Sequence, residues 1–328
     1  MRCVRFTEPG GPEVIELGDV PDPRPAGGEV LVRVRAAGLN RADLLQRRGL
    51  YPPPPGTSPD IPGLEFAGEI EALGEGVLGW SVGERVMGIA AGGAQAQRLA
   101  VHHRMLVRIP AALELEEAAA LPEAFITAHD ALVTQAAFRP GEAVLVHAVG
   151  SGVGTAALQL VRAGGGTSIG TSRSQDKLTR AIGLGLHQAI QVGPDRRFSS
   201  EVSTLTEGRG ANVILDFVGS AYLAENLEAL ATRGRLAWIG TLGGTEGAVD
   251  IGLVMRKRLR LFGTTLRGRP LEEKMVASQA FAAEVVPLLV RGLVRPVVDR
   301  VYPMADVRQA HEQLENDRTF GKLVLRIE

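Results

Sequence analysis

The sequence predicts an α/β protein with two domains, a β-rich partly open barrel and a doubly wound parallel sheet. Three observations lead to this fold class. The first third of the 328 residues holds short alternating strands separated by glycine and proline turns. The middle of the chain alternates strand and helix patterns, and a glycine cluster there joins an apolar strand directly to a helix.

The first six residues are expected to form a first strand, and a second strand is predicted at 31–36, where apolar and charged residues alternate with a period of two. Further strand candidates are 66–72, 85–89 and 97–101. Turn clusters lie at 21–25, 51–56, 74–76 and 92–93. A helical pattern at 114–120 then leads into the next region.

From residue 142 the pattern changes to alternating strands and helices. Strands are predicted at 143–149, 167–172, 188–192, 212–218, 235–240 and 259–264. Helices are predicted at 153–163, 175–184, 199–207 and 222–231. Six strands with helical crossovers are typical of a doubly wound parallel sheet.

The tail after Thr265 resembles neither another βαβ unit nor a linker. It carries a helix at 272–291, a strand at 297–302, a helix at 305–315 and a strand at 322–326. We therefore expect the tail to return to the β-rich region. The predicted domains are residues 1–122 with 265–328 and, inserted between them, residues 123–264.

The glycine cluster follows the apolar strand that starts at Ala143. Its residues are Gly150, Ser151, Gly152, Val153 and Gly154. Glycines let a pyrophosphate approach the backbone closely, and the N–H groups at the start of the next helix bind its oxygens. The spacing departs from a strict G-x-G-x-x-G, whose last glycine would fall on Thr155. The alternative is a packing turn in another kind of α/β protein.

The next strand ends where an acidic residue would hold the ribose 2′-hydroxyl of NAD. No Asp or Glu occupies that end; the residues there are Ser172, Arg173 and Ser174, followed by Lys177. Hydroxyls and two cations suit a 2′-phosphate, which favours NADPH as the cofactor. The alternative is a solvated loop with an N-cap serine and a basic first helical turn.

Composition excludes several other classes of function. With 36 basic against 37 acidic residues, the chain has no electrostatic footprint for nucleic acid or anionic membranes. The basic run Arg256–Arg260 is interpreted as a solvated strand edge. No apolar run approaches the roughly 18 residues of a membrane span, and the first residues lack a signal peptide. Cys3, the single cysteine, permits no intrachain disulfide, so a cytoplasmic location is expected.

Several separate motifs together resemble one enzyme family. They are Val34–Leu44, Tyr51–Gly56, Pro62–Ile70, Gly83–Met87, Ala119–Ala128 and His147–Gly154. These segments are similar to the zinc-free quinone oxidoreductases of the medium-chain dehydrogenase/reductase superfamily, in particular the tumour-suppressor-inducible group and its bacterial relatives. The resemblance covers essentially the whole chain. It implies a GroES-like catalytic domain and a Rossmann domain that binds NADPH.

The resemblance also bears on metal binding. Zinc alcohol dehydrogenases of this superfamily hold their catalytic metal with two Cys and one His. Asn40 stands where they carry the first Cys, and Leu64 stands where they carry the His. With Cys3 as the only cysteine, neither this site nor a four-cysteine structural site can form. No metal is therefore expected.

Without zinc, the acceptor must be one that is readily reduced. A quinone or an α,β-unsaturated carbonyl delocalises the charge that hydride brings, so positioning supplies much of the catalysis. Asn40 and Tyr51 are the expected donors near the acceptor oxygen, and Thr127 resembles the family's threonine at the nicotinamide. The alternatives are an N-cap for Asn40, a ring packed on its proline run for Tyr51, and a back-bond within a helix for Thr127.

The resemblance implies further cofactor contacts. They are Gly219 after one strand, Gly240 and Leu242 after the next, and Leu266 and Arg267 at the return to the first domain. One departure stands out, because the family usually has a Tyr beside the 2′-phosphate where this chain has Val192. His147 is interpreted as a core residue whose tautomer is fixed by the backbone.

The predicted function is NADPH-dependent reduction of quinones or activated enones without zinc. The alternative is an NADPH-binding protein with a structural, regulatory or RNA-binding role and little turnover. The expected partners are a small-molecule acceptor and a second copy of the chain, with no nucleic acid or membrane. The homodimer is expected to pair the strand at 259–264 with its symmetry mate, because an open apolar edge would aggregate. The tail helices could instead cover that edge.

Overall fold

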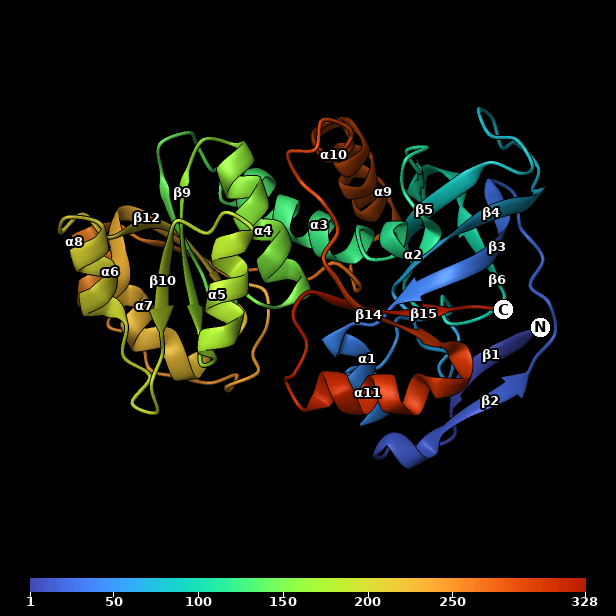
Figure 1. The fold of residues 1–328 in the computed structure, drawn as a ribbon, viewed down its shortest axis with the longest axis horizontal. Helices are drawn as coiled ribbons and strands as arrows, with labels where there is room; N and C mark the ends of the chain where they lie inside the picture. The colour runs from blue at the N-terminus through green and yellow to red at the C-terminus, as the bar shows by residue number, and fades with distance from the viewer. The chain divides into compact units, whose positions relative to one another are not determined.

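The computed structural model describes residues 1–328, which form two compact units. Unit 1 comprises Met1–Ile126, Leu266–Val290 and Arg295–Glu328. Unit 2 comprises Thr127–Thr265 and Arg291–Val294. The α/β fold class predicted from the sequence is confirmed: unit 1 is built on a largely antiparallel sheet, and unit 2 on a parallel one (Figure 1).

Unit 1 contains a seven-stranded sheet in the order β14-β15-β3-β4-β5-β7, with β6 paired to β3, and a separate β1-β2 pair. Its strands are β1 (Arg2–Phe6), β2 (Ile15–Asp19), β3 (Glu29–Gly38), β4 (Glu65–Leu73), β5 (Arg85–Ile89), β6 (Arg98–His102), β7 (Leu106–Arg108), β14 (Val298–Pro303) and β15 (Lys322–Arg326). Strand β15 pairs antiparallel with the end of β3, Val324 opposite Gly38. The tail therefore completes the sheet that the first strands begin.

The helices of unit 1 are α1 (Arg41–Arg47), α2 (Leu115–Ala118), α9 (Leu271–Ala280), α10 (Val286–Val290) and α11 (Val307–Glu315), with short 3₁₀ turns at Pro12–Val14, His103–Met105 and Met304–Asp306. Helices α1 and α11 lie side by side (Figure 1). The long helix expected at 272–291 is interrupted by a π-helical turn, Phe281–Val285. Pro287 explains the interruption, because it lacks an N–H and crowds the preceding turn.

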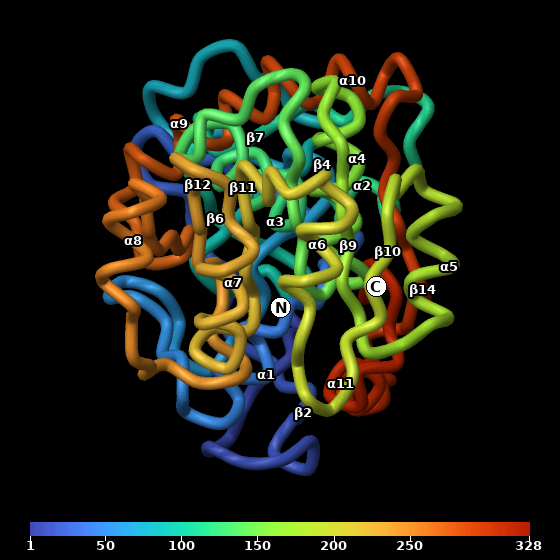
Figure 2. The backbone as a smooth tube through the Cα atoms, turned by 90° about the vertical axis from the view of Figure 1, so that its left-hand side faces the viewer, coloured from blue at the N-terminus to red at the C-terminus, as the bar shows by residue number.

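Unit 2 contains a six-stranded, wholly parallel sheet in the order β10-β9-β8-β11-β12-β13. Its strands are β8 (Ala143–Val146), β9 (Thr167–Ser172), β10 (Gln188–Gln191), β11 (Ala211–Asp216), β12 (Leu230–Trp238) and β13 (Arg260–Gly263). Figure 2 shows the strands running from β10 at one side to β12 at the other. The strand order steps outward from β8 in both directions, as in a doubly wound sheet.

The helices of unit 2 are α4 (Gly152–Ala163), α5 (Gln175–Gly183), α6 (Ser199–Leu205), α7 (Leu223–Ala229) and α8 (Ile251–Lys257), with a π-helix at Asp130–Gln135 and a 3₁₀ turn at Ser220–Tyr222. Helix α3 (Pro122–His129) leads into this unit. Right-handed crossovers place α4 and α5 on one face of the sheet and α6, α7 and α8 on the other (Figure 1). No helix of the chain combines the length and apolar character of a membrane span.

One interpretation from the sequence is wrong. The basic run Arg256–Arg260 is not a strand edge throughout, because Arg256 and Lys257 end α8, a helix that the sequence reading missed. Arg258 caps that helix in the left-handed conformation, with φ of 51°. The Lys257 ammonium donates to the carbonyls of Leu227, Glu228 and Leu230. The basic residues thus stabilise the end of a helix and its packing.

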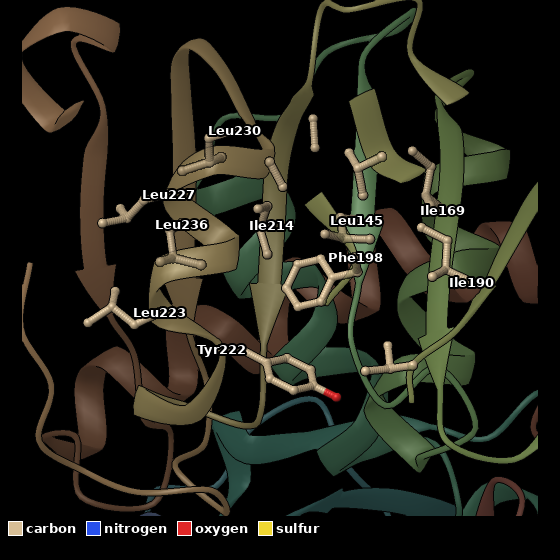
Figure 3. Packing of buried hydrophobic residues seen from close by; sticks show 14 of the residues in the cluster. Leu145, Ile169, Ile190, Phe198, Ile214, Tyr222, Leu223, Leu227, Leu230 and Leu236 are labelled. Atoms are coloured by element: carbon tan, nitrogen blue, oxygen red, sulfur yellow. The ribbon is translucent and has the colours of Figure 1, made fainter. Parts of the chain in front are cut away.

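The core of unit 2 is an apolar cluster between the sheet and helices α6, α7 and α8. Leu145, Ile169, Ile190 and Ile214 point into it from four neighbouring strands, and Phe198 lies near its centre (Figure 3). The central strands β8 and β11 are buried on both faces, which explains their apolar runs, whereas the edge strand β10 is more exposed and more polar. The cluster fixes the strands whose carboxyl ends carry the predicted cofactor residues.

Candidate active site

The first part of the site is a buried polar cluster in unit 1 around Asn40. Lys322, at the start of β15, donates from Nζ to Glu65 Oε1 at 2.6 Å, to Asn40 Oδ1 at 2.6 Å and to the Leu39 carbonyl at 2.6 Å. Asn40 in turn donates from Nδ2 to Glu65 Oε1 at 3.0 Å. The side-chain amide of Asn40 is therefore held in one orientation, with its oxygen on a cation and its nitrogen on an anion.

Asn40 retains one donor after these contacts. Its second amide hydrogen has only a long contact to the Gly38 carbonyl, at 3.5 Å. Lys322, in contrast, uses all three of its N–H groups inside the cluster. A ligand that enters this site can therefore take a hydrogen bond from Asn40 but none from the ammonium.

The position that holds zinc in related dehydrogenases has a different chemistry here. Leu64 is 2% exposed and packs in the core, and the Asn40 oxygen accepts from the Lys322 ammonium. Zinc sites of this kind need thiolate or imidazole ligands. The two residues at these positions supply neither, so they do not fit the metal.

Asp43 fixes the start of helix α1, directly after Asn40. Its carboxylate accepts the backbone N–H of Asn40 at 2.8 Å and that of Gly63 at 3.3 Å. Burial raises the pKa of Asp43 to about 6, although both backbone hydrogen bonds oppose the shift. Gly63 has φ of 110°, and a Cβ there would lie 2.5 Å from the Gln95 nitrogen. The turn therefore requires glycine, and Asp43 ties it to Asn40.

Tyr51 lies against Arg267, which is 5% exposed in unit 1. The guanidinium donates to the carbonyls of Ala91 at 2.7 Å and Tyr51 at 3.1 Å, and to Gln46 Oε1 at 2.6 Å. Its central carbon is 5.2 Å from the centre of the Tyr51 ring. Burial raises the pKa of Tyr51, so the phenol keeps its proton and can donate a hydrogen bond at neutral pH.

Within unit 1, Arg267 and Leu266 have structural contacts. The guanidinium bridges three segments of this unit, and Leu266 is 7% exposed. Their predicted contact with the cofactor stays a prediction.

Glu123, in the first turn of α3, joins the same cluster and was missed by the sequence reading. Its backbone N–H donates to Glu65 Oε2 at 2.8 Å. Burial, and then the Glu65 carboxylate, raise the pKa of Glu123 to about 8. In the sequence it follows Pro122, where an acid is an ordinary helix-start residue, so nothing distinguished it. Thr127, predicted from the resemblance, lies one turn further along this half-buried helix surface.

In unit 2, the predicted glycine cluster forms the turn between β8 and α4. Ser151 is the N-cap, and its hydroxyl accepts the Gly154 N–H at 3.0 Å. A Cβ on Gly154 would lie 2.6 Å from the Ala148 carbonyl, so this glycine allows helix and strand to pack closely. Gly152 and Val153 are the first two residues of the helix, whose N–H groups have no partner within it. This turn suits a pyrophosphate.

The predicted 2′-phosphate group lies at the end of β9 and the first turn of α5. Ser172 Oγ accepts the Ser174 N–H at 3.1 Å, and Ser174 Oγ accepts the Lys177 N–H at 3.3 Å. Both hydroxyls therefore stabilise the turn. Ser174 is the N-cap of α5, which agrees with the alternative interpretation of this segment as a solvated loop with an N-cap serine. The side chains that suit a phosphate best are those of Arg173 and Lys177.

Val192 directly follows β10, and its backbone N–H donates to the Ser172 carbonyl at 3.0 Å, but its side chain is buried in the core of unit 2, at 3% exposure. Tyr222, a residue of the same core cluster, packs edge-on against His147, with ring centres 4.8 Å apart. Burial raises the pKa of the Tyr222 phenol, and the positive charges of Arg173 and Arg196 oppose that rise. The sequence pattern did not show that Tyr222 lies within electrostatic range of Arg173 and Arg196, since the three residues come from separate segments.

A chain of buried polar side chains reaches the Gly219 turn. The ring of His147 lies between Thr171 Oγ1 at 2.8 Å and Asn226 Oδ1 at 2.7 Å. Asn226 donates to Asp216, which accepts the Gly219 N–H at 3.2 Å. His147 is buried as expected, but side chains and not the backbone hold its ring nitrogens. Sequence pattern could not show this, since the partners come from different elements.

The remaining predicted residues follow β11 and β12. Gly219 has φ of 84°, and a Cβ there would lie 2.5 Å from the Gly244 carbonyl. Gly240 and Leu242 come after β12, where Leu242 is 58% exposed. In a parallel sheet these turns share one edge with those after β8 and β9. The structure therefore brings the predicted cofactor residues of unit 2 to a single edge.

Comparison with known proteins agrees with this architecture. Residues 26–111 match the alcohol dehydrogenase GroES-like domain, and residues 184–325 match the zinc-binding dehydrogenase family. A quinone oxidoreductase of Lama guanicoe is 34% identical over 99% of this chain and 97% of its own length. That of Pseudomonas aeruginosa is 34% identical over 98% of both chains. This chain belongs to the quinone oxidoreductases of the medium-chain dehydrogenase/reductase superfamily.

Solved structures of this superfamily have the same fold. An Escherichia coli quinone oxidoreductase complexed with NADPH aligns with a TM-score of 0.86 at 28% identity, covering 99% of this chain and 100% of its own. A structure described as an NAD-dependent alcohol dehydrogenase aligns with a TM-score of 0.88 at 33% identity over all of both chains. The family predicted from the sequence motifs is confirmed, and with it an oxidoreductase.

Proposed function

We propose that this oxidoreductase transfers hydride from NADPH to a quinone or an activated α,β-unsaturated carbonyl without zinc. The observation that carries the proposal is the Lys322–Asn40–Glu65 cluster. The proposal is supported by a fixed amide donor at Asn40 and by the lack of a thiolate or imidazole at the two positions, 40 and 64, where the resemblance puts the zinc ligands of related dehydrogenases. NADPH is the cofactor in the Escherichia coli structure, and the basic end of β9 supports the same cofactor here.

The chain's own residues would perform three tasks. The glycine turn 150–154 and the Gly219 turn would hold the pyrophosphate and its flanking groups, and Arg173 with Lys177 would hold a 2′-phosphate. The cofactor supplies the hydride. Asn40 and Tyr51 would donate hydrogen bonds to the acceptor oxygen, where negative charge develops. A quinone or enone stabilises that charge by delocalisation, so neutral donors can support it without a metal.

The experiment is a turnover screen that follows NADPH oxidation with quinones, enones and saturated ketones. Turnover is expected with the first two classes, and it should survive exhaustive dialysis against EDTA. Loss of activity in EDTA that zinc restores would refute the zinc-free reaction. NADPH binding without oxidation by any acceptor would support the alternative, a binding protein with little turnover.

We further propose that the protein is a homodimer in the cytoplasm. Strand β13 is at the edge of the parallel sheet, and its Leu261 and Phe262 are only partly buried. Pairing between two copies of this edge would satisfy its backbone groups and cover both side chains.

A further inference from the structure

Glu123 is the one carboxylate of the Asn40 cluster without a fixed role. Both oxygens of Glu65 are occupied, by Lys322 and Asn40 on one side and by the Glu123 N–H on the other. Both oxygens of Asp43 accept backbone N–H groups. The carboxyl of Glu123, although half-buried, has no hydrogen bond or ion pair within the chain. A polar group in such a place is available to a ligand.

The surroundings of Glu123 keep it in the acid form. The charged and titratable groups that act on Glu123 electrostatically come from several segments. They are Glu65 of β4, Asp43 of α1, Lys322 of β15, Lys274 of α9, and Tyr51 and Arg267 from loops. Burial and the two carboxylates raise its pKa to about 8, and the opposing effect of Lys322 and Arg267 is smaller. At neutral pH the group therefore carries a proton that it can donate.

Its place on helix α3 puts Glu123 on the same helix face as a residue predicted to contact the cofactor. Residues four apart lie on one face of a helix, so Glu123 and Thr127 share a face. Thr127 is the predicted nicotinamide contact, and Tyr51, the predicted acceptor contact, lies within electrostatic range of Glu123.

We propose that Glu123 is the catalytic acid that protonates the reduced acceptor. This inference rests on the proposed function. NADPH transfers a hydride, one hydrogen nucleus with two electrons, to the acceptor and is thereby oxidised to NADP⁺. The acceptor oxygen, now an oxyanion, takes the proton from the Glu123 carboxyl, and the resulting carboxylate regains a proton from solvent. Tyr51 is the weaker acid, since burial raises its pKa, and it remains a hydrogen-bond donor.

The test compares wild type with Glu123→Gln, Glu123→Asp and the control Glu273→Gln, which removes an exposed acid from the first turn of α9. Steady-state rates are measured between pH 5.5 and 9.5 with an enone and a quinone. We expect wild-type kcat to fall above a pH of about 8. Glu123→Gln should lose about 10²-fold in kcat and should lack this alkaline decline. Glu123→Asp should retain the decline with intermediate activity, and Glu273→Gln should match wild type.

NADPH titration by fluorescence distinguishes a failure of the acid role of Glu123 from a failure of the proposed function. Glu123→Gln is expected to bind NADPH as wild type does. If Glu123→Gln keeps wild-type kcat and the same alkaline decline while wild type turns over, Glu123 is not the acid and the proposed function stands. Wild type that binds NADPH but reduces no acceptor would refute both. Should Glu123→Gln not fold, a Glu123→Asp profile identical in rate and shape to wild type would equally refute the acid role.

Discussion

Replacing Lys322 by Met should destabilise unit 1 strongly, because it leaves the Glu65 carboxylate buried without its counter-ion. Glu65 is 0% exposed and the Lys322 side chain 5% exposed, so solvent cannot take the place of the ammonium. The change also removes the donors to Asn40 and Leu39. Methionine fills a similar volume, so the loss comes from charge and hydrogen bonds and not from a cavity.

The magnitude follows from the geometry. Two unit charges 2.6 Å apart attract by about 6 kcal/mol at an effective dielectric constant of roughly 20. Part of this attraction offsets the desolvation of both ions. Removing one partner of such a buried pair typically costs about 3–5 kcal/mol, because the other charge remains buried. We expect a loss in that range. Glu65→Gln combined with Lys322→Met removes both charges and should recover more than half of it.

The assay can isolate unit 1, because the two tryptophans fall one in each unit, Trp80 in unit 1 and Trp238 in unit 2. Guanidinium unfolding is followed by Trp80 fluorescence in a Trp238→Phe background shared by all variants. A loss below about 1 kcal/mol for Lys322→Met would show that the pair is not an isolated buried ion pair. A double variant no more stable than Lys322→Met would show that the unpaired charge is not the cause.

Four further predictions concern binding, catalysis, pH and assembly. Arg173→Ala with Lys177→Ala should weaken NADPH binding by about 1–3 kcal/mol and leave NADH nearly unchanged, as fluorescence titration with both cofactors would show. Tyr51→Phe should lower kcat/KM by about 1–2 kcal/mol without changing NADPH affinity; complete loss of hydride transfer in a folded variant would contradict its role as a hydrogen-bond donor only. Burial lowers the pKa of His147 to about 4, so between pH 6.5 and pH 4 the unfolded chain binds a proton that the folded chain does not. The free energy of unfolding should therefore fall by up to about 3 kcal/mol over this range. Urea unfolding at several pH values should show a shallower pH dependence for His147→Gln. Light scattering at micromolar concentration should give twice the 34.7 kDa chain mass, and a monomer would refute the dimer paired through 259–264.

Local pattern was sufficient to predict most elements of unit 2. The strand at 167–172 and the helix at 153–163 follow from apolar periodicity bounded by glycines, and the structure has β9 at Thr167–Ser172 and α4 at Gly152–Ala163. The predicted residues at the strand ends also come to one edge, because parallel strands share it by topology. The missed helix α8 contains Gly252 and follows a long irregular stretch, so its periodicity was weak.

The polar clusters could not be predicted in the same way. Lys322 and Asn40 are 282 residues apart, and their contact depends on β15 pairing with the end of β3. Lys322 carries no local signal, since a lysine at a strand start is usually solvated, and Asn40 was predicted only through the family resemblance. Glu123 was missed, and the surroundings of Tyr222 could not be foreseen, for the same reason. Their surroundings are created by segments remote in sequence, whereas the glycine turn is created by its own residues.

The Lys322 cluster also explains why the proposed reaction is confined to easily reduced acceptors. A positive charge does stand beside Asn40, but all three N–H groups of the ammonium are directed at Glu65, Asn40 and Leu39. The carboxylate of Glu65 also neutralises it, so the cluster presents little net charge to a ligand. It can orient the Asn40 amide but cannot polarise a substrate oxygen as a metal does. The proposed catalysis would therefore draw on neutral donors and on acceptors that delocalise their own charge.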